Sequence, residues 1–302
     1  MSLLFPQSHT LRTPPRVPPV VFALSFAVLT LWGTGQEARA EERWRRVQSE
    51  RIEVVGNAGE RDLQRVATLL EKFRSILSSM HQRAAAGSAV GTRVLVLKGN
   101  KRFRQIAPLR HGKPEPAVSA FFLSGETHNY IALTAGGGPQ ESKRRDRVVL
   151  DGYYRFLLRN RIPAAPLWLE EGAAKYFSSF VLSKSGEEAR LGGPIGEYLS
   201  LLRSGKLLPL RALFAVTRDS PIYHDPNRRV FFEAQCWALV SYLNEQMNGR
   251  IIPELAGLMA SGTRPEEANK KASGIDLPVL ERVLRQQVRS LGIHSSHRIT
   301  LP

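Results

Sequence analysis

The sequence contains a single cysteine, Cys236, among its 302 residues. An intramolecular disulfide is therefore excluded, and the core alone must hold the fold together. Cys236 lies in the apolar segment 231–240. A buried structural thiol is favoured there, because a reactive thiolate needs a cationic and accessible setting. A chain of this length can bury a sizeable core without cross-links, as one large domain or two small ones.

Acidic residues are few relative to basic ones. The chain has 27 Asp and Glu against 43 Lys and Arg, which gives a formal net charge of +16. A surface of this sign attracts anionic partners at long range, such as cell-envelope polymers, lipid headgroups, acidic proteins or nucleic acid. Nucleic acid is the least favoured of these, because the chain carries no nucleic-acid recognition motif.

The N-terminal apolar run, Val20–Trp32, is too short to cross a membrane. It has 13 residues, whereas a spanning helix needs about 20. Arg12 and Arg16 precede the run and the small-residue site 38–40 follows it, which is the order of a secretory signal peptide. We therefore expect an exported protein, periplasmic or extracellular, that loses residues 1–40 and keeps no integral membrane span. A membrane tether through an uncleaved signal is the alternative.

Apolar periodicity divides residues 41–290 into two parts. In the first part, 41–140, β-branched segments predict strands, and apolar residues every three or four positions predict one helix. The strands are expected at 51–56, 92–97, 118–123 and 130–133, and the helix at 60–80. In the second part, helices are expected at about 145–160, 168–182, 193–203, 229–247, 250–261, 264–272 and 277–290. We predict an α+β fold in one domain, a small mixed sheet followed by a helical bundle, with a loose polar tail at 291–302.

Glycines and cations precede the second part. The segment 136–139 is Gly-Gly-Gly-Pro, and no Lys-Ser or Lys-Thr pair follows, so it is predicted to be a turn and not a phosphate loop. Basic residues then recur at 143–147 and continue to Arg159 and Arg161. Such a run is normally a solvated face. Alternatively, Arg159 and Arg161 border a cleft and make it attractive to anions.

The most specific pattern is a pair of helical segments joined by a proline turn. The first segment is 147–158, the turn is Pro163–Pro166, and the segment 168–176 reads WLEEGAAKY. This pair resembles the gluzincin zinc metallopeptidases, in particular the small exported branch called peptidase MA-like. In that family the first helix carries H-E-x-x-H, and the second carries W-L-x-E-G-x-A-x-Y, whose glutamate is the third zinc ligand. The resemblance covers about residues 44–245 and implies the architecture of a gluzincin catalytic domain.

Only the second half of the family pattern is present. Trp168, Gly172 and Tyr176 match it, and the resemblance places Glu171 at the third ligand position. In the first half, the two family histidines fall on Asp151 and Arg155, and the catalytic glutamate falls on Gly152. Asp151, Gly152 and Arg155 are therefore the degenerate positions of the motif.

The replaced residues cannot perform zinc hydrolysis. Two imidazoles at positions i and i+4 of a helix grip one zinc ion, and the intervening glutamate polarises the attacking water. Asp151 could ligate through oxygen, but Arg155 stays protonated and offers no lone pair. Gly152 provides no general base. We therefore expect no catalytic residue and no cofactor, with Glu171 as the only surviving metal-ligand position.

Asp151 and Arg155 also have the spacing of a helical ion pair, with the acid N-terminal to the base. If the fold is kept, Glu171 faces them. The hypothesis is that Arg155 takes the place of the metal and bridges Asp151 and Glu171, so that a buried acid is not left unpaired.

Other histidines do not suggest a replacement site. His81, His111, His128 and His224 are scattered, and His294 and His297 lie three apart in the predicted tail. The neighbouring residue Tyr223 lies at a distance along the chain where gluzincins often place a residue that stabilises the oxyanion.

These observations favour an exported, catalytically inactive pseudo-peptidase that binds a peptide, a protein or an anionic cell-envelope polymer. Two alternatives stay open. The first is an active metal-dependent hydrolase with zinc in a non-standard site around Asp151 and Glu171. The second is a basic scaffold protein that acts through its surface charge. The sequence does not determine the oligomeric state.

Overall fold

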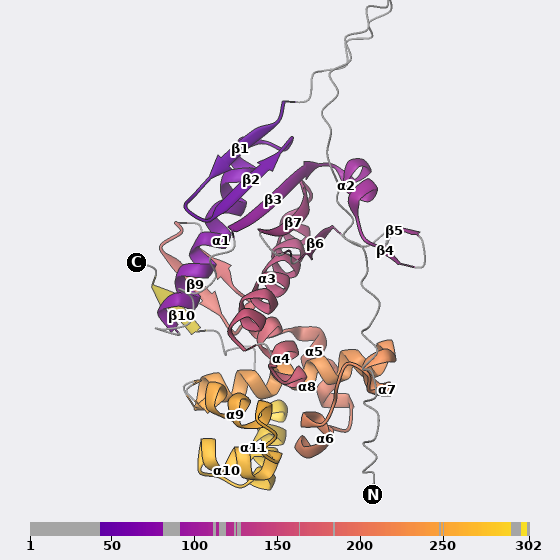
Figure 1. Cartoon of the computed structure of the whole chain (residues 1–302), viewed down its shortest axis with the longest axis vertical. Coiled ribbons are helices and arrows are strands. Elements are labelled where there is room, and N and C mark those ends of the chain that lie inside the picture. Colours follow the sequence, from indigo (N-terminus) through magenta and orange to yellow (C-terminus); the bar gives the residue numbers. More distant parts are fainter. Residues whose placement is uncertain are drawn as a thin grey trace, which may run out of the picture. The chain divides into compact units, whose positions relative to one another are not determined.

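The computed structural model describes residues 43–80, 91–110, 113–114, 119–123, 125, 128–162, 164–183, 185–247, 249, 251–290 and 297–300. The predicted signal peptide at 1–40 lies outside the described residues. A mixed sheet comes first along the chain and a mostly helical part follows it, which confirms the predicted α+β class (Figure 1). None of the helices in the described part is long and apolar enough to span a membrane.

The sheet has five strands in the order β1-β2-β3-β7-β6. Its strands are β1 (Arg45–Gln48), β2 (Ile52–Gly56), β3 (Gly91–Lys98), β6 (Ala120–Leu123) and β7 (His128–Ala135). The central strands β2, β3 and β7 run parallel, and the edge strands β1 and β6 pair with them antiparallel. Buried parallel strands explain the apolar, β-branched character of β3, whose Val94 and Val96 face one side and Leu97 the other.

Helices cover both faces of the sheet. Helix α1 (Glu60–Met80) connects β2 to β3 and packs with α3 (Pro139–Arg161) on the larger core, where the rings of Phe73 and Tyr153 lie 6.3 Å apart. The short helix α2 (Asn100–Ile106) lies on the smaller core and packs Phe103 against Phe121 of β6. Because α3 lies over β6 and β7, the sheet holds this helix in place for the site described below.

Helix α3 begins earlier than the predicted 145–160. The glycine turn is present, with positive φ at Gly136 and Gly137, but the helix starts directly after it at Pro139. Arg145 is buried beneath this turn and donates a hydrogen bond to the carbonyl of Gly136. The basic run 143–147 is therefore not wholly a solvated face, since one of its members holds the start of the helix.

Helix α4 (Leu167–Phe177) ends before the predicted 182. Two serines end it, because their hydroxyls compete for backbone groups. The Ser179 hydroxyl donates to the carbonyl of Tyr176 (2.6 Å) and accepts from the amide of Gly192 (2.7 Å). The chain then forms the short strand β8 (Val181–Leu182), which pairs with β9 (Glu188–Leu191).

The C-terminal tail is a correction to the sequence prediction. Residues 297–300, expected to be loose, form strand β10 (His297–Thr300) antiparallel to β9. The unpaired edge of β9 supplies backbone partners that no local periodicity in the tail could reveal. Residues 291–296 and 301–302 lie outside the described part of the chain.

The remaining helices form the lower part of Figure 1, where α5, α7 and α11 pack on α8 (Pro226–Gln246). They are α5 (Gly196–Ser204), α6 (Leu210–Phe214), α7 (Pro221–His224), α9 (Ile251–Ala260), α10 (Pro265–Ser273) and α11 (Leu277–Ser290). The minor strands β4 (Leu109–Arg110) and β5 (Lys113–Pro114) form a separate pair.

Helices α4 and α8 cross at Gly172, where a Cβ would collide with the carbonyl oxygen of Cys236.

Replacing Gly172 with alanine is therefore expected to lower the free energy of unfolding by about 1–3 kcal/mol, because the two helices must move apart. The matched control is Gly257→Ala in α9, where a Cβ would meet nothing within 4 Å. That change is expected to raise the free energy of unfolding by about 0.5–1 kcal/mol. Urea denaturation followed by circular dichroism measures both. Equal stability of the Gly172→Ala and unmodified proteins would contradict the close crossing.

Candidate functional site

The structure brings Asp151, Arg155 and Glu171 together at the contact of α3 with α4. Asp151 and Arg155 are one turn apart on α3, and Glu171 lies on the facing side of α4. Glu171 is fully buried, at 0 % exposure, and its neighbour Glu170 is 5 % exposed. Two adjacent buried carboxylates are costly unless cations or donors pair with them, and the surrounding residues provide such partners.

Arg155 lies at the centre of the site and directs each of its nitrogens at a different carboxylate. Its Nε donates to Asp151 Oδ1 (2.7 Å), and its Nη2 donates to Glu171 Oε2 (2.7 Å). Its Nη1 lies 3.4 Å from Glu170 Oε1. The side chain is 17 % exposed. A planar guanidinium with fixed donors suits this arrangement better than a point charge would.

The other carboxylate oxygens have partners on α3 and α4 themselves, on α7 and in the turn before α7. Lys175 Nζ lies 2.9 Å from Asp151 Oδ2. The Tyr223 hydroxyl donates to Glu171 Oε1 (2.7 Å). Arg159 Nη2 (2.5 Å) and Arg218 Nη2 (2.7 Å) approach the two oxygens of Glu170. Of these residues, the sequence singled out Arg159 and Tyr223 without assigning their partners, and it did not indicate Arg218.

A fourth acid, Glu233 of α8, extends the cluster. Arg229 Nε lies 2.8 Å from Glu233 Oε1, and Lys175 Nζ lies 3.9 Å from Glu233 Oε2. The Arg229 guanidinium also lies over the Tyr223 ring, 4.3 Å from its centre. We call the whole set the Arg155 network. Its acids are Asp151, Glu170, Glu171 and Glu233, and its cations are Arg155, Arg159, Lys175, Arg218 and Arg229.

The network shifts the protonation of its members in a consistent direction. Burial alone would raise the pKa of Asp151, but Lys175 and Arg155 outweigh it and hold that pKa below its ordinary value. Burial likewise opposes the charge of Glu170, yet Arg159 and Arg218 lower its pKa. Burial and the neighbouring Glu171 raise the pKa of Tyr223 to about 12, so its hydroxyl remains a donor. Asp151 and Glu170 are thus held ionised, as acceptors for the neighbouring basic residues.

Gly152, the position of the catalytic glutamate in the family pattern, is closed off. A Cβ at this position would lie 2.5 Å from Cβ of Phe122 on strand β6. Phe122 in turn packs against Phe156, one turn further along α3, with ring centres 5.9 Å apart. A longer side chain at position 152 would have to displace the edge strand, so the sheet occupies the space that a general base would need.

The other motif residues have structural roles in α4. Trp168 is fully buried and packs its ring 5.2 Å from that of Phe214. Tyr176 is 1 % exposed and lies edge-on against Phe177. Together with Gly172, they fix α4 in the core and so determine where Glu171 points. The motif therefore positions a carboxylate, and of the residues that the pattern specifies only Glu171 enters the network.

The Arg155 network, as far as the structure describes it, contains no histidine. His128 lies on β7, His224 on α7 and His297 on β10, while His81, His111 and His294 fall outside the described residues. Within the described ranges, no three His, Cys, Asp or Glu side chains come together as a metal-ligand group.

The residues at the centre do not fit a zinc ion. The oxygens of Asp151 and Glu171 that face each other are both occupied by donors of Arg155, which carries a positive charge of its own. A dication would have to displace that guanidinium and then overcome the repulsion of Lys175, 2.9 Å from the same aspartate. The donor set thus suits an ion-pair cluster, and no reaction step through a metal follows from it.

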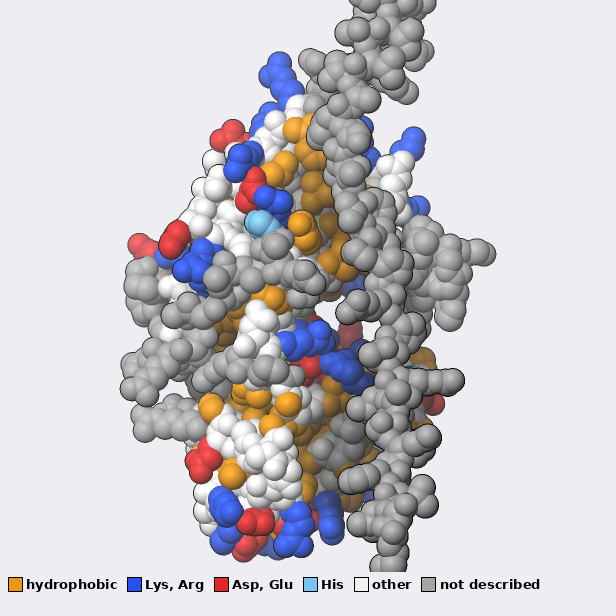
Figure 2. Space-filling model, in the orientation of Figure 1, with side chains coloured by type: hydrophobic (Ala, Val, Ile, Leu, Met, Phe, Trp, Pro, Cys, Tyr) orange, Lys and Arg blue, Asp and Glu red, His pale blue; other side chains and the backbone are white. Residues whose placement is uncertain are grey.

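A cleft of about 270 Å³ opens beside the network. Its lining combines both charges with apolar side chains: Arg147, Val148, Asp151, Lys175, Ser178, Ile195, Glu197 and Tyr198. Asp151 and Lys175 thus belong both to the network and to the cleft wall. Figure 2 shows Lys and Arg side chains gathered with acidic ones at a hollow between the sheet part and the helices.

In comparisons with known proteins, the sequence matched no protein-family model and no curated protein sequence. The resemblance to gluzincins therefore stays a prediction from the sequence, carried mainly by the segment 168–176 and the helix before it.

Replacing Arg155 with methionine is expected to lower the free energy of unfolding by about 3–5 kcal/mol, because Asp151 and buried Glu171 would lose their shared partner. The matched control is Arg159→Met. Arg159 is 51 % exposed and pairs only with Glu170 among the described acids, so its loss is expected to cost at most about 1 kcal/mol. Guanidinium denaturation of the two variants measures the difference. Similar losses in both would contradict the central role of Arg155.

Gly152→Ala tests the closed position on the same helix. Alanine in a helix interior is normally favoured over glycine by about 1 kcal/mol. Here the contact with Phe122 is expected to reverse the sign and lower the free energy of unfolding by about 1–3 kcal/mol. A second variant, Gly152→Ala with Phe122→Gly, separates the contact from other effects, because glycine at position 122 removes the Cβ that lies 2.5 Å away. A double-mutant cycle without coupling would contradict the proposed collision.

Proposed function

We propose that this chain is an exported, non-catalytic binding protein built on a frame like that of gluzincin peptidases. It takes a segment of peptide or protein in the cleft beside the Arg155 network. The observation that carries the proposal is the position of Arg155, whose guanidinium bridges Asp151 and Glu171 with two 2.7 Å contacts. These ion pairs hold Asp151 in place as part of the cleft wall. The Arg155 guanidinium offers no lone pair to a metal.

The loss of catalysis is supported independently by the neighbouring position. A hydrolase of this type needs a base next to the reacting water. Gly152 has no side chain, and Phe122 occupies the space into which a glutamate would extend. In this proposal, an ion pair stands at the family's metal position and a packing contact stands at its base position.

The chemistry of the cleft favours a peptide over a uniformly anionic polymer. Arg147 and Lys175 bring positive charge, and Glu197 brings negative charge. The exposed side chain of Val148, at 42 %, adds an apolar surface that has no role in the core. A peptide carries apolar side chains and groups of both signs, whereas a polyanion would be repelled by Glu197. Export is inferred from the signal-like sequence of residues 1–40.

The experiment combines a metal assay with a binding assay on the purified protein. We expect substoichiometric zinc, no hydrolysis of a casein substrate, and binding to members of a random hexapeptide array. Val148→Asp is expected to lower the affinity for the selected peptides roughly tenfold, since it places a charge on an apolar contact. Val279→Asp is the matched control, because Val279 is similarly exposed at 38 % but lies on α11.

Two results would replace this proposal by the alternatives. Stoichiometric zinc with chelator-sensitive proteolysis, both lost in Glu171→Gln, would establish an active hydrolase. Binding that ignores Val148→Asp and collapses with ionic strength would establish a scaffold acting through surface charge.

A further inference from the structure

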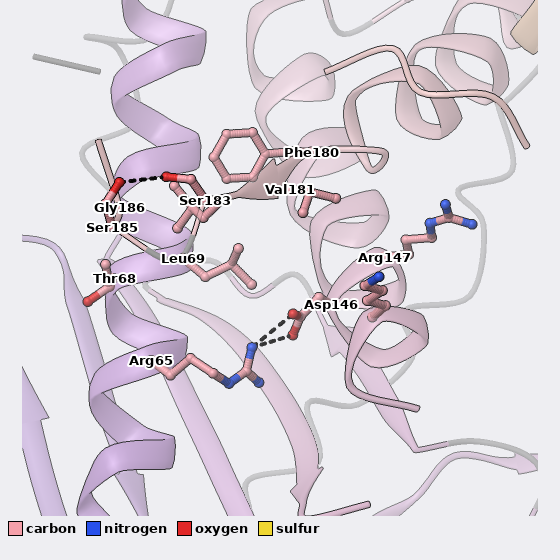
Figure 3. A pocket seen from close by; sticks show the side chains of 12 residues that line it. Arg65, Thr68, Leu69, Asp146, Arg147, Phe180, Val181, Ser183, Ser185 and Gly186 are labelled. Carbon is pink, nitrogen blue, oxygen red and sulfur yellow. Dashed lines mark hydrogen bonds and ion pairs between the residues drawn. The ribbon is translucent and has the colours of Figure 1, made fainter. Parts of the chain in front are cut away.

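A second and larger cavity lies away from the Arg155 network, between α1, the start of α3 and the turn from β8 to β9 (Figure 3). Its volume is about 510 Å³, within the range of about 300–1,000 Å³ that small-molecule sites occupy. It is lined by Arg65, Thr68, Leu69, Lys143, Asp146, Arg147, Phe180, Val181, Leu182, Ser183, Ser185 and Gly186.

The charged residues of this cavity leave an excess of positive charge. Arg65 forms an ion pair with Asp146, and its Nη1 lies 3.0 Å and 2.8 Å from the two carboxylate oxygens. Lys143 and Arg147 are exposed and form no ion pair with any residue that the structure describes. Two cations are thus available at one side of the cavity, and Asp146, the single acid among the described lining residues, is already neutralised. This side suits an anionic group.

The opposite side is apolar. Figure 3 shows Phe180 and Val181 across from the ion pair of Arg65 and Asp146, with Leu69 beside them. Phe180 and Leu69 belong to the buried core, but Val181 is 42 % exposed and is one of few large apolar side chains left at the surface. An exposed apolar residue inside a concave site is covered favourably by an apolar ligand.

The hydroxyls of Ser183 and Ser185 in the β8–β9 turn form their hydrogen bonds within the turn itself. The hydroxyls of Ser183 and Ser185 lie 3.0 Å apart, and Ser183 accepts from the amide of Glu188. Gly186, with φ of 73°, allows this tight turn. The described part of the lining has no Asn or Gln side chain, and β8 is only two residues long. A peptide backbone in this cavity would therefore leave its own donors and acceptors largely unpaired.

We propose that this cavity binds an amphiphilic anion, a molecule with a linear acyl or alkyl chain and a single carboxylate or phosphate head. The chain covers Val181, Phe180 and Leu69, and the head lies between Lys143 and Arg147. An inorganic anion would leave the apolar side uncovered, and a neutral lipid would leave the cations without a partner. The proposal goes beyond the peptide-binding role, and it does not depend on the Arg155 network. Of the lining residues, Arg147 alone also borders the cleft.

The experiment is calorimetric titration of the purified protein with dodecanoate and with dodecyl phosphate, below their micelle concentrations. Val181→Asp is expected to lower the affinity for both ligands at least tenfold, because it places a negative charge, like that of the ligand, on the apolar side. Lys143→Gln is expected to weaken both roughly tenfold, because the head loses a charged donor. The two ligands together distinguish a carboxylate-binding from a phosphate-binding head site.

The controls are matched in residue type and lie on α11. Val279→Asp repeats the valine substitution, and Arg282→Gln repeats the loss of one exposed cation. Neither is expected to change affinity, since α11 packs on α5, α6, α8 and α10, and none of these lines the cavity. Val148→Asp, in the cleft, is likewise expected to leave dodecanoate binding unchanged, which separates failure here from failure of the peptide-binding role.

Three results would overturn the proposal. Dodecanoate that binds equally well to Val181→Asp and to the unmodified protein would place the ligand elsewhere. Inorganic phosphate that binds as tightly as dodecyl phosphate would show a simple anion site. A hydrophobic tetrapeptide that binds more tightly than dodecanoate, with the same sensitivity to Val181→Asp, would show that the cavity belongs to a peptide.

Discussion

The bridge that Arg155 makes between Asp151 of α3 and Glu171 of α4 is the interaction on which the helical part depends. Glu171 is fully buried, so this side of α4 could not enter the core without a cation to receive it. Tyr223 and Lys175 then tie the same carboxylates to α7 and, through Glu233, to α8. One guanidinium thus organises several helices around itself, in the way that a structural ion does in other proteins.

Much of the fold followed from local patterns. The parallel strands and most helices appear where apolar periodicity predicted them, because burial on one or both faces imprints a regular spacing. The predictions were wrong where side chains or distant strands decide the outcome. Ser179 ends α4 through a bond to Gly192, and β10 forms because β9 has a free edge. In both cases the two interacting segments are far apart in the sequence, so the residues around each segment do not predict the interaction.

The site was predictable in part for the same reason. The spacing of Asp151 and Arg155 on one helix is local, and the family pattern placed Glu171 opposite them. Arg218 could not be foreseen, since it reaches Glu170 from a turn 48 residues away. The collision behind Gly152 was equally hidden, because Phe122 lies on an edge strand whose register with the helix no sequence rule gives.

The contact of Gly152 with Phe122 also constrains the order in which this protein can change. A glutamate at position 152 would collide with the Cβ of Phe122, 2.5 Å from its own Cβ, so it has no room unless Phe122 is replaced by the smaller glycine. The smaller side chain alone would leave a cavity beside Phe156. Changing either position alone is therefore expected to destabilise the fold, so the residues at positions 122 and 152 can change favourably only together.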